Sequence, residues 1–165
     1  AHYADPAFSF REPIGVTAIA FLRGPRFPCR LQGRLLVGDT NFGRLYLFEL
    51  NAARDGLALA GALADNVADN AAEREAVVFG QGWGITSDLT IGPDGALYHL
   101  SLLDGSVRRI ASATPRSDLD GDASVGLADL RILLESFDRD AGGDVNCDGT
   151  TDLTDLAILL RDFGA

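Results

Sequence analysis

The residues of this chain best suited to chemistry are acidic, and they lie near the C-terminus in two loops with the same spacing. The loop 118–129 matches the loop 144–155 at an offset of 26 residues (144 minus 118). A repeat that shares both the spacing of ligands and the pattern of the following helix is a strong signal of a duplicated unit. We predict that each loop binds one Ca²⁺.

Calcium explains the spacing of these oxygens. It is a hard cation that takes about six to eight oxygens at roughly 2.3–2.6 Å, from loop positions 1, 3, 5, 7, 9 and 12. Position 7 supplies a backbone carbonyl, and position 9 often acts through a water molecule. The predicted ligands of the first loop are Asp118, Asp120, Asp122, the Ser124 carbonyl and Asp129. Those of the second loop are Asp144, Asn146, Asp148, the Thr150 carbonyl, Asp152 and Asp155.

The two loops are not equivalent. Position 6, where the turn favours glycine, is Ala123 in the first loop and Gly149 in the second. Position 9 is Gly126 in the first loop and Asp152 in the second. We therefore expect the first site to be the weaker one. Without metal the carboxylates of each loop repel one another, so we expect folding of the module to depend on calcium.

A short helix is predicted after each loop, at 130–137 and 156–163. Apolar residues recur there at helical spacing and predict a small shared core. They are Leu130, Leu133, Leu134 and Phe137 in the first helix and Leu156, Leu159, Leu160 and Phe163 in the second.

With its DLDGD…ADL and DVNCDG…TDL motifs, the segment 118–165 resembles the type I dockerin family. As in that family, neither loop has a full entering helix, since ATPRS precedes the first and DAGG the second. The resemblance implies docking to a cohesin-like domain in an extracellular assembly. It also implies that loop positions 10 and 11 read the partner. Cellulosomal members often carry a Ser/Thr pair there, whereas this chain has Leu127, Ala128, Leu153 and Thr154, which suggests a more apolar docking surface.

The N-terminal part has a β pattern. Short, partly alternating apolar segments are bounded by turn residues and predict an antiparallel architecture. These segments are 16–22, 34–39, 44–50, 85–91, 96–103 and 106–111. We predict a mainly β domain over 1–113, a linker at 114–117 and the small helical module at 118–165. The stretch 51–76, rich in Ala, Asp and Asn, fits a surface loop with at most one helical turn.

The segments VGDTNFGRLY and GPDGALY carry a second resemblance, to the closing blades of the glucose/sorbosone dehydrogenase family. Members of that family are six-bladed β-propellers that use a quinone cofactor. The similarity spans about residues 12–111, roughly two blades. The family's catalytic histidine belongs to earlier blades, so we assign no catalytic residue to this chain and expect no quinone in it alone. We lean against an enzyme.

Two propeller blades cannot close a ring, so their outer edges are open to pairing. We expect a non-catalytic assembly protein that docks in a calcium-dependent way, to a cohesin-like domain or to another copy, and forms a homo-oligomer, polymer or filament. The N-terminal segment 1–10 is a candidate for a donated strand. Two alternatives remain: the C-terminal part of a dockerin-tethered quinoprotein sugar dehydrogenase, and a secreted carbohydrate-binding module that uses Trp83.

Charge and cysteines narrow the setting. The net charge of −10 without a basic stripe argues against nucleic acid as a partner. No apolar run approaches the roughly 18 residues of a membrane span. A Cys29–Cys147 disulfide is the leading prediction, with separate thiols or pairing between chains left open. We expect an extracellular or cell-surface protein, either with its signal peptide removed or cut from a longer chain.

Overall fold

The computed structural model describes residues 5–164, which fold as two compact units. The first, here called the β unit, comprises residues 5–22, 33–92 and 97–109. The second, here called the loop–helix unit, comprises residues 23–32, 93–96 and 110–164. The segments 23–32 and 93–96, which the sequence analysis assigned to the β domain, and the predicted linker 114–117 thus lie in the loop–helix unit.

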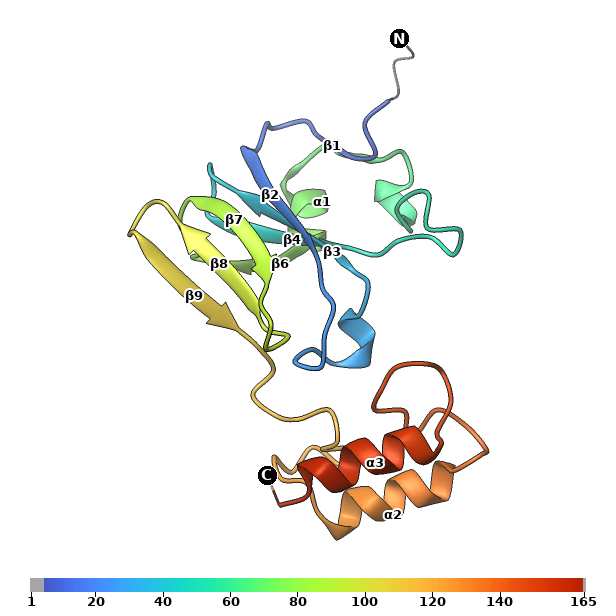
Figure 1. The fold of residues 1–165 in the computed structure, drawn as a ribbon. Coiled ribbons are helices and arrows are strands. Elements are labelled where there is room, and N and C mark those ends of the chain that lie inside the picture. The colour runs from blue at the N-terminus through green and yellow to red at the C-terminus, as the bar shows by residue number, and fades with distance from the viewer. Residues whose placement is uncertain (1–4, 165) are drawn as a thin grey trace. The chain divides into compact units, whose positions relative to one another are not determined.

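The larger sheet of the β unit has four antiparallel strands in the order β2-β3-β4-β6 (Figure 1). They are β2 (Val16–Phe21), β3 (Leu35–Asp39), β4 (Arg44–Phe48) and β6 (Val78–Gln81). The first three confirm the predicted segments. The fourth was not predicted, because its four residues VFGQ include a glycine and are too few to show an alternating pattern.

A second sheet has three strands, β7 (Thr86–Ile91), β8 (Leu97–Ser101) and β9 (Ser106–Ile110), all at predicted positions. Within the β unit, β7 lies against β2 and β3. A Cβ at Gly38 of β3 would lie 2.3 Å from Thr86 Cγ2, so this approach requires glycine. The Thr17 hydroxyl donates a hydrogen bond to the Thr86 carbonyl. The prediction of a mainly β fold with antiparallel sheets is confirmed.

The stretch 51–76 is more ordered than predicted. It holds the 3₁₀ turn η2 (Gly61–Leu63), the strand β5 (Val67–Ala68) and the helix α1 (Ala71–Ala76). The side chain of Asn70 starts α1 by accepting a hydrogen bond from the Glu73 amide at 3.1 Å. This Asn-x-x-Glu pattern is the sequence signal that could have located the helix.

The N-terminal segment packs on its own unit. The short strand β1 (Ser9–Phe10) pairs in parallel with β5. The ring of Phe8 lies 4.9 Å from that of Phe48, and the ring of Phe10 lies 5.1 Å from that of Tyr46. Residues 8–10 of the segment suggested as a donated strand therefore contact their own chain. Residues 1–4 of that segment lie outside the described residues.

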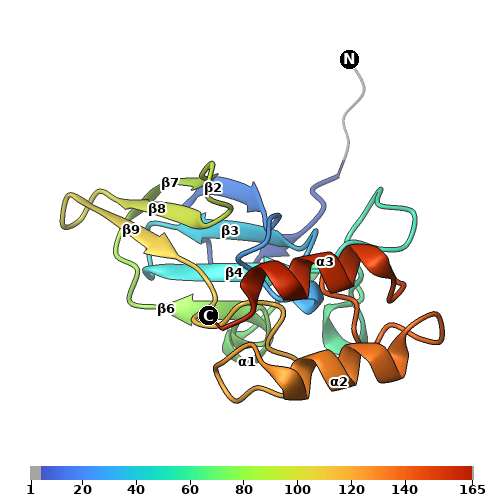
Figure 2. The same ribbon diagram turned by 60° about the horizontal axis from the view of Figure 1, so that its bottom comes forward.

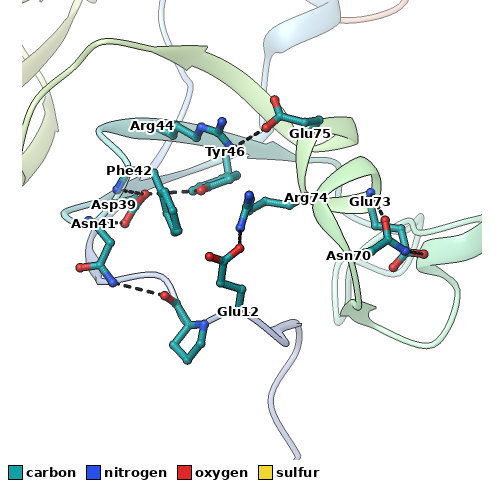
Figure 3. A network of polar contacts seen from close by, with 11 residues as sticks. Glu12, Asp39, Asn41, Phe42, Arg44, Tyr46, Asn70, Glu73, Arg74 and Glu75 are labelled. Carbon is teal, nitrogen blue, oxygen red and sulfur yellow. Dashed lines mark hydrogen bonds and ion pairs between the residues drawn. The ribbon is translucent and has the colours of Figure 1, made fainter.

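A buried carboxylate fixes the turn between β3 and β4 (Figure 3). Asp39 is fully buried and accepts backbone hydrogen bonds from Gly15 at 3.1 Å, Asn41 at 2.7 Å and Phe42 at 3.0 Å. Burial, together with the charge of Asp39, raises the pKa of Tyr46 to about 12. The acidic group therefore orders the turn, because every one of its strong bonds goes to the backbone.

Two arginines cover the same turn (Figure 3). Arg74 pairs with Glu12, and Arg44 pairs with Glu75 at 2.6 Å. Both guanidinium groups face the Phe42 ring, at 4.6 Å for Arg74 and 5.7 Å for Arg44. This network ties α1 to β4 and to the N-terminal segment, and we assign it a structural role.

In the loop–helix unit the two helices are α2 (Leu127–Ser136) and α3 (Leu153–Asp162), which pack side by side (Figure 2). A third short element, the 3₁₀ turn η1 (Cys29–Leu31), comes from the segment 23–32. The buried core consists of Val125, Leu133 and Leu159. No helix within residues 5–164 has the length and apolarity needed to cross a membrane.

Part of the predicted apolar stripe is not in that core. Leu133 and Leu159 are fully buried, whereas Leu134 is 53% and Leu160 54% exposed. A helix turns about 100° per residue, so a side chain one position after a buried leucine points away from the core. Placing Leu134 and Leu160 in the core was therefore wrong. Placing Phe163 there was wrong as well, because it is 44% exposed after the end of α3.

Candidate metal centre

Three carboxylates converge in the first loop. Oxygens of Asp118, Asp120 and Asp129 all lie within 4.8 Å of one another. With bonds of roughly 2.3–2.6 Å, two oxygens on opposite sides of a calcium ion are about 4.6–5.2 Å apart. The spacing and the all-oxygen donor set thus fit a hard cation of this size, and they bring together positions 1, 3 and 12 of the predicted site.

Backbone amides orient the carboxylate at position 12. Asp129 Oδ1 accepts from Leu119 N at 2.7 Å and Asp120 N at 3.2 Å, and its Oδ2 accepts from Gly126 N at 2.7 Å. Burial alone would raise the pKa of Asp129, but these hydrogen bonds outweigh it and hold the pKa below its ordinary value. The group therefore stays ionised, and it joins the loop to the first turn of α2.

The second loop repeats this arrangement. Asp155 Oδ1 accepts from Val145 N at 2.9 Å and Asn146 N at 3.0 Å, and its Oδ2 accepts from Asp152 N at 2.9 Å. Position 3 is here an amide, Asn146, which donates to Asp148 Oδ2 at 2.9 Å. At positions 1, 3 and 12 the second loop accordingly has two carboxylates, where the first loop has three.

Position 1 of each loop closes the turn in the same way. Asp118 accepts from Gly121 N at 2.8 Å and Ala123 N at 3.2 Å. Its counterpart Asp144 accepts from Cys147 N at 2.6 Å and Gly149 N at 2.8 Å. The same atoms at the same offsets take part in both loops, which shows that the sequence repeat is also a structural repeat.

Positions 4 and 6 of both loops have left-handed backbones. At position 4, φ is +80° for Gly121 and +68° for Cys147, and at position 6 it is +70° for Ala123 and +95° for Gly149. Position 6 favours glycine because of this conformation, so Ala123, which has a side chain, carries backbone strain there. The strain of a second non-glycine residue, Cys147, was not foreseen.

The side chains at positions 5 and 9 make hydrogen bonds within their own loops, and Asp122 is not among the three carboxylates that converge in the first loop. Asp122 accepts from the amide and the hydroxyl of Ser124, at 2.8 and 2.7 Å, and Asp148 does the same with Thr150, at 3.0 and 2.7 Å. The Thr150 and Asn146 side chains hold the pKa of Asp148 below its ordinary value. Asp152 serves as the N-cap of α3, because its side chain accepts from Thr154 N at 2.7 Å.

The two repeats exchange their final hydrogen bonds. Gly164 N, which follows α3, donates to the Val125 carbonyl of the first loop at 2.8 Å. Asp138 N, which follows α2, donates to the Thr151 carbonyl of the second loop at 3.0 Å. Val125 and Thr151 are both buried and occupy the same loop position, so each helix ends on the loop of the other repeat.

The predicted docking residues are all on the surface. Leu127 is 76% and Leu153 71% exposed, and Ala128 and Thr154 beside them are exposed as well. Leu134 and Leu160 lie seven residues further along the same helices. Seven residues are about two helical turns, so each pair shares one face of its helix. These two leucines were not predicted as docking residues, because leucines at helical spacing are ordinarily core residues.

The Cys29–Cys147 disulfide is confirmed, with an S–S distance of 2.08 Å and a Cα–Cα distance of 5.4 Å. Beside it lies Arg116, which comes from the predicted linker. One of its nitrogens, Nη1, donates to the Val145 carbonyl at 3.0 Å and to Cys147 Sγ at 2.9 Å. Burial lowers the pKa of Arg116, an effect that the charge of Asp144 opposes. No sequence pattern distinguished this arginine, because its partners are distant in the chain.

In the β unit, the imidazole of His99 and the indole of Trp83 pack together. His99 is fully buried, with Nε2 3.0 Å from Thr86 Oγ1, and the Trp83 ring packs 5.4 Å from its imidazole. Arg108 donates to the carbonyls of Gly82 and Trp83 at 3.3 and 3.2 Å. The buried His99 and the half-buried Trp83 thus contribute to the packing of the β unit.

Comparison with known proteins yields no match: no family model, no curated protein and no solved structure is significantly similar to this chain.

Proposed function

We propose that the loop–helix unit is a calcium-dependent docking module of the dockerin type, carried by a non-catalytic extracellular assembly protein. One observation carries the proposal. In both loops the position-12 carboxylate accepts three backbone amides, and the position-1 carboxylate accepts the amides of positions 4 and 6. Two independent stretches of sequence thus build one arrangement of oxygens.

Bound calcium would supply the positive charge that offsets the repulsion between these carboxylates. Asp118, Asp120 and Asp129 would hold the ion in the first loop, and Asp144 and Asp155 in the second. The position-12 residues sit in the first helical turn, so their coordination would fix each helix relative to its loop. The helices would then present a constant outer face.

That face would be the docking surface. It consists of two leucine pairs, Leu127 with Leu134 on α2 and Leu153 with Leu160 on α3. Large side chains with more than half of their surface exposed are typical of interaction sites when they cluster. The partner would be a cohesin-like domain or another copy of this chain. The open sheets of the β unit offer further edges for assembly into a polymer.

The disulfide supports an extracellular or cell-surface location, because such bonds persist in oxidising compartments. The β unit would serve assembly rather than catalysis. Its His99 is fully buried and packs against the ring of Trp83, which is half-buried.

Calorimetric titration of chelator-stripped protein tests the metal part. We expect two calcium ions per chain. Asp120 and Asn146 occupy position 3 of the first and the second loop. Asp120→Ala should therefore weaken calcium binding by the first loop, and Asn146→Ala binding by the second, each by at least about tenfold. Glu135→Gln, on the exposed side of α2, is the matched control and should change neither. An oxidised wild-type protein that takes up no calcium would refute the proposal.

Light scattering with calcium and with chelator tests docking, first on the protein alone and then with a cohesin-like domain added. We expect calcium-dependent association in one of these two mixtures, and its loss in Leu127→Asp/Leu153→Asp. If the wild type binds calcium but remains a monomer in both mixtures, docking of this type is wrong.

A further inference from the structure

The two loops differ most at position 4. In the first loop this position is Gly121, and a Cβ placed there would have no neighbour within 4 Å. In the second loop it is Cys147, which is bonded to Cys29 from the segment 23–32. The first loop is thus free at the position where the second is covalently held.

Arg116 strengthens this attachment. Its Nη2 donates to the Gly24 carbonyl at 2.5 Å, while its Nη1 binds Val145 O and Cys147 Sγ. It therefore bridges the segment that carries Cys29 to the loop that carries Cys147. We call Cys29, Cys147 and Arg116 the loop clamp.

The loop clamp acts on the residues that orient the predicted ligands. Cys147 N donates to Asp144 Oδ1 at 2.6 Å, and Val145 N donates to Asp155 Oδ1 at 2.9 Å. Cys29 Sγ, which has no hydrogen in the disulfide, packs 3.4 Å from the Asp144 carbonyl oxygen. The loop clamp holds the backbone at Val145 and Cys147, the two residues whose amides bind these carboxylates. The carboxylates are therefore kept in one arrangement before an ion binds.

Cys147 also has a costly backbone. Its φ of +68° is unfavourable for a residue with a side chain. Such a conformation persists where surrounding bonds over-determine it. Here the disulfide and the Arg116 contact supply those bonds, whereas Gly121 adopts the same conformation in the first loop without help.

We propose that the second loop is a redox-controlled calcium site and the first loop a redox-independent one, an inference that rests on the calcium sites proposed above. In the reduction step a dithiol breaks the Cys29–Cys147 bond. Two electrons and two protons pass to the sulfurs, two thiols form, and the dithiol closes to its own disulfide. The second loop then loses its preorganisation and binds calcium more weakly, while the first is unaffected.

Single-loop backgrounds isolate the effect. Asp120→Ala leaves the second loop as the stronger site, and Asn146→Ala leaves the first. In each background, calorimetry compares the oxidised protein with its Cys29→Ser/Cys147→Ser form. We expect about tenfold weaker binding without the disulfide in the Asp120→Ala background and less than about a twofold change in the Asn146→Ala background.

Two further arms leave the cysteines in place. Wild-type protein treated with dithiothreitol should show the same selective loss. Arg116→Gln keeps the disulfide and removes only the hydrogen bonds of the guanidinium group. It should weaken calcium binding by the second loop by about threefold. Arg131→Gln, which breaks only an exposed ion pair on α2, is its control. Hydrogen exchange of the amides 145–149 should speed up in the reduced protein without calcium.

The possible failures are distinguishable. Oxidised wild-type protein without any bound calcium overturns the proposed function, and this inference with it. Calcium binding by both loops, with the second loop equally tight before and after reduction, overturns only the redox control. An equal loss at both loops also overturns it, because it would mean that the disulfide stabilises the whole unit rather than one site.

Discussion

At the scale of single residues, the two loops solve one backbone problem with different side chains. Both need left-handed conformations at positions 4 and 6, and glycine meets the need at Gly121 and Gly149. Ala123 and Cys147 meet it at a cost of about 1–2 kcal/mol each. The loops are therefore strained at opposite positions, the first at position 6 and the second at position 4.

Exchanging the position-6 residues should relieve the first loop and leave the second loop strained at both positions. Ala123→Gly removes the left-handed cost, which exceeds the roughly 0.4–1 kcal/mol that glycine loses through a freer unfolded chain. Calcium binding by the first loop should tighten by about two- to fivefold. Gly149→Ala should weaken the second loop by a similar factor. Competition with a chelating dye measures both.

Gly126→Ala is the control for this exchange. Its backbone is extended and a Cβ there would meet nothing within 4 Å, so calcium binding should not change. An Ala123→Gly variant with unchanged affinity would show that strain at position 6 does not limit the first site.

His99 should make the β unit sensitive to acid. Burial, and then the charge of Arg108, lower the pKa of its imidazole below the ordinary value of 6.5. The unfolded chain therefore binds more protons than the folded one in this range, so stability falls as the pH drops through 6.5 and below. Urea unfolding followed by Trp83 fluorescence should give a lower midpoint at pH 5 than at pH 7.

His99→Gln should flatten this pH dependence, because the amide does not titrate. His2→Gln removes the only other imidazole and should leave it unchanged. A pH dependence that survives His99→Gln would assign the effect to other groups.

At the scale of elements, adjacent leucines of one helix have opposite roles. Leu133 is fully buried in the core of the loop–helix unit, and Leu134 faces outward. Leu133→Ala should cost about 2–4 kcal/mol of stability, because it leaves a cavity between α2 and α3. Leu134→Ala should change stability by less than about 0.5 kcal/mol. Thermal melting of the helical circular dichroism in calcium measures both, and equal losses would contradict the assignment.

The elements that could be predicted are those with a local signal. Six strands followed from alternating apolar residues and turn chemistry, and both C-terminal helices followed from the stripe behind each loop. The strand β6 and the helix α1 are too short to show a period. The faces of Leu134 and Leu160 depend on how the helices pack, which an apolar stripe does not specify.

In the candidate metal centre, too, the local features could be predicted and the contacts between distant residues could not. Its ligands are within one loop each, so their spacing alone could bring them together. Arg116 could not be predicted, because it acts on Gly24 and Val145, which are far from it in the chain. The exchanged hydrogen bonds of Asp138 and Gly164 likewise join one repeat to the other.

At the scale of the whole molecule, the chain carries a built-in reporter for one of its two units. Its single tryptophan, Trp83, lies in the β unit, and the helices α2 and α3 lie in the other. Removal of calcium by a chelator should lower the melting temperature of the helical signal by several degrees. The unfolding midpoint seen by Trp83 fluorescence should stay within about 1 °C, because no predicted ligand lies in the β unit.

The same chelator experiment on Asp120→Ala/Asn146→Ala is the control, and it should show no shift in either signal. A Trp83 transition that moves together with the helical signal would show that the two units unfold as one.

The disulfide also shapes how the chain is made and how it breaks down. It joins positions separated by 118 residues, and the strands β3 to β9 lie within the covalent ring that it closes. During synthesis Cys29 emerges long before its partner, so those strands can fold while the ring is still open. Once the ring is closed, a single protease cut between Cys29 and Cys147 leaves the two fragments linked until a reductant releases them.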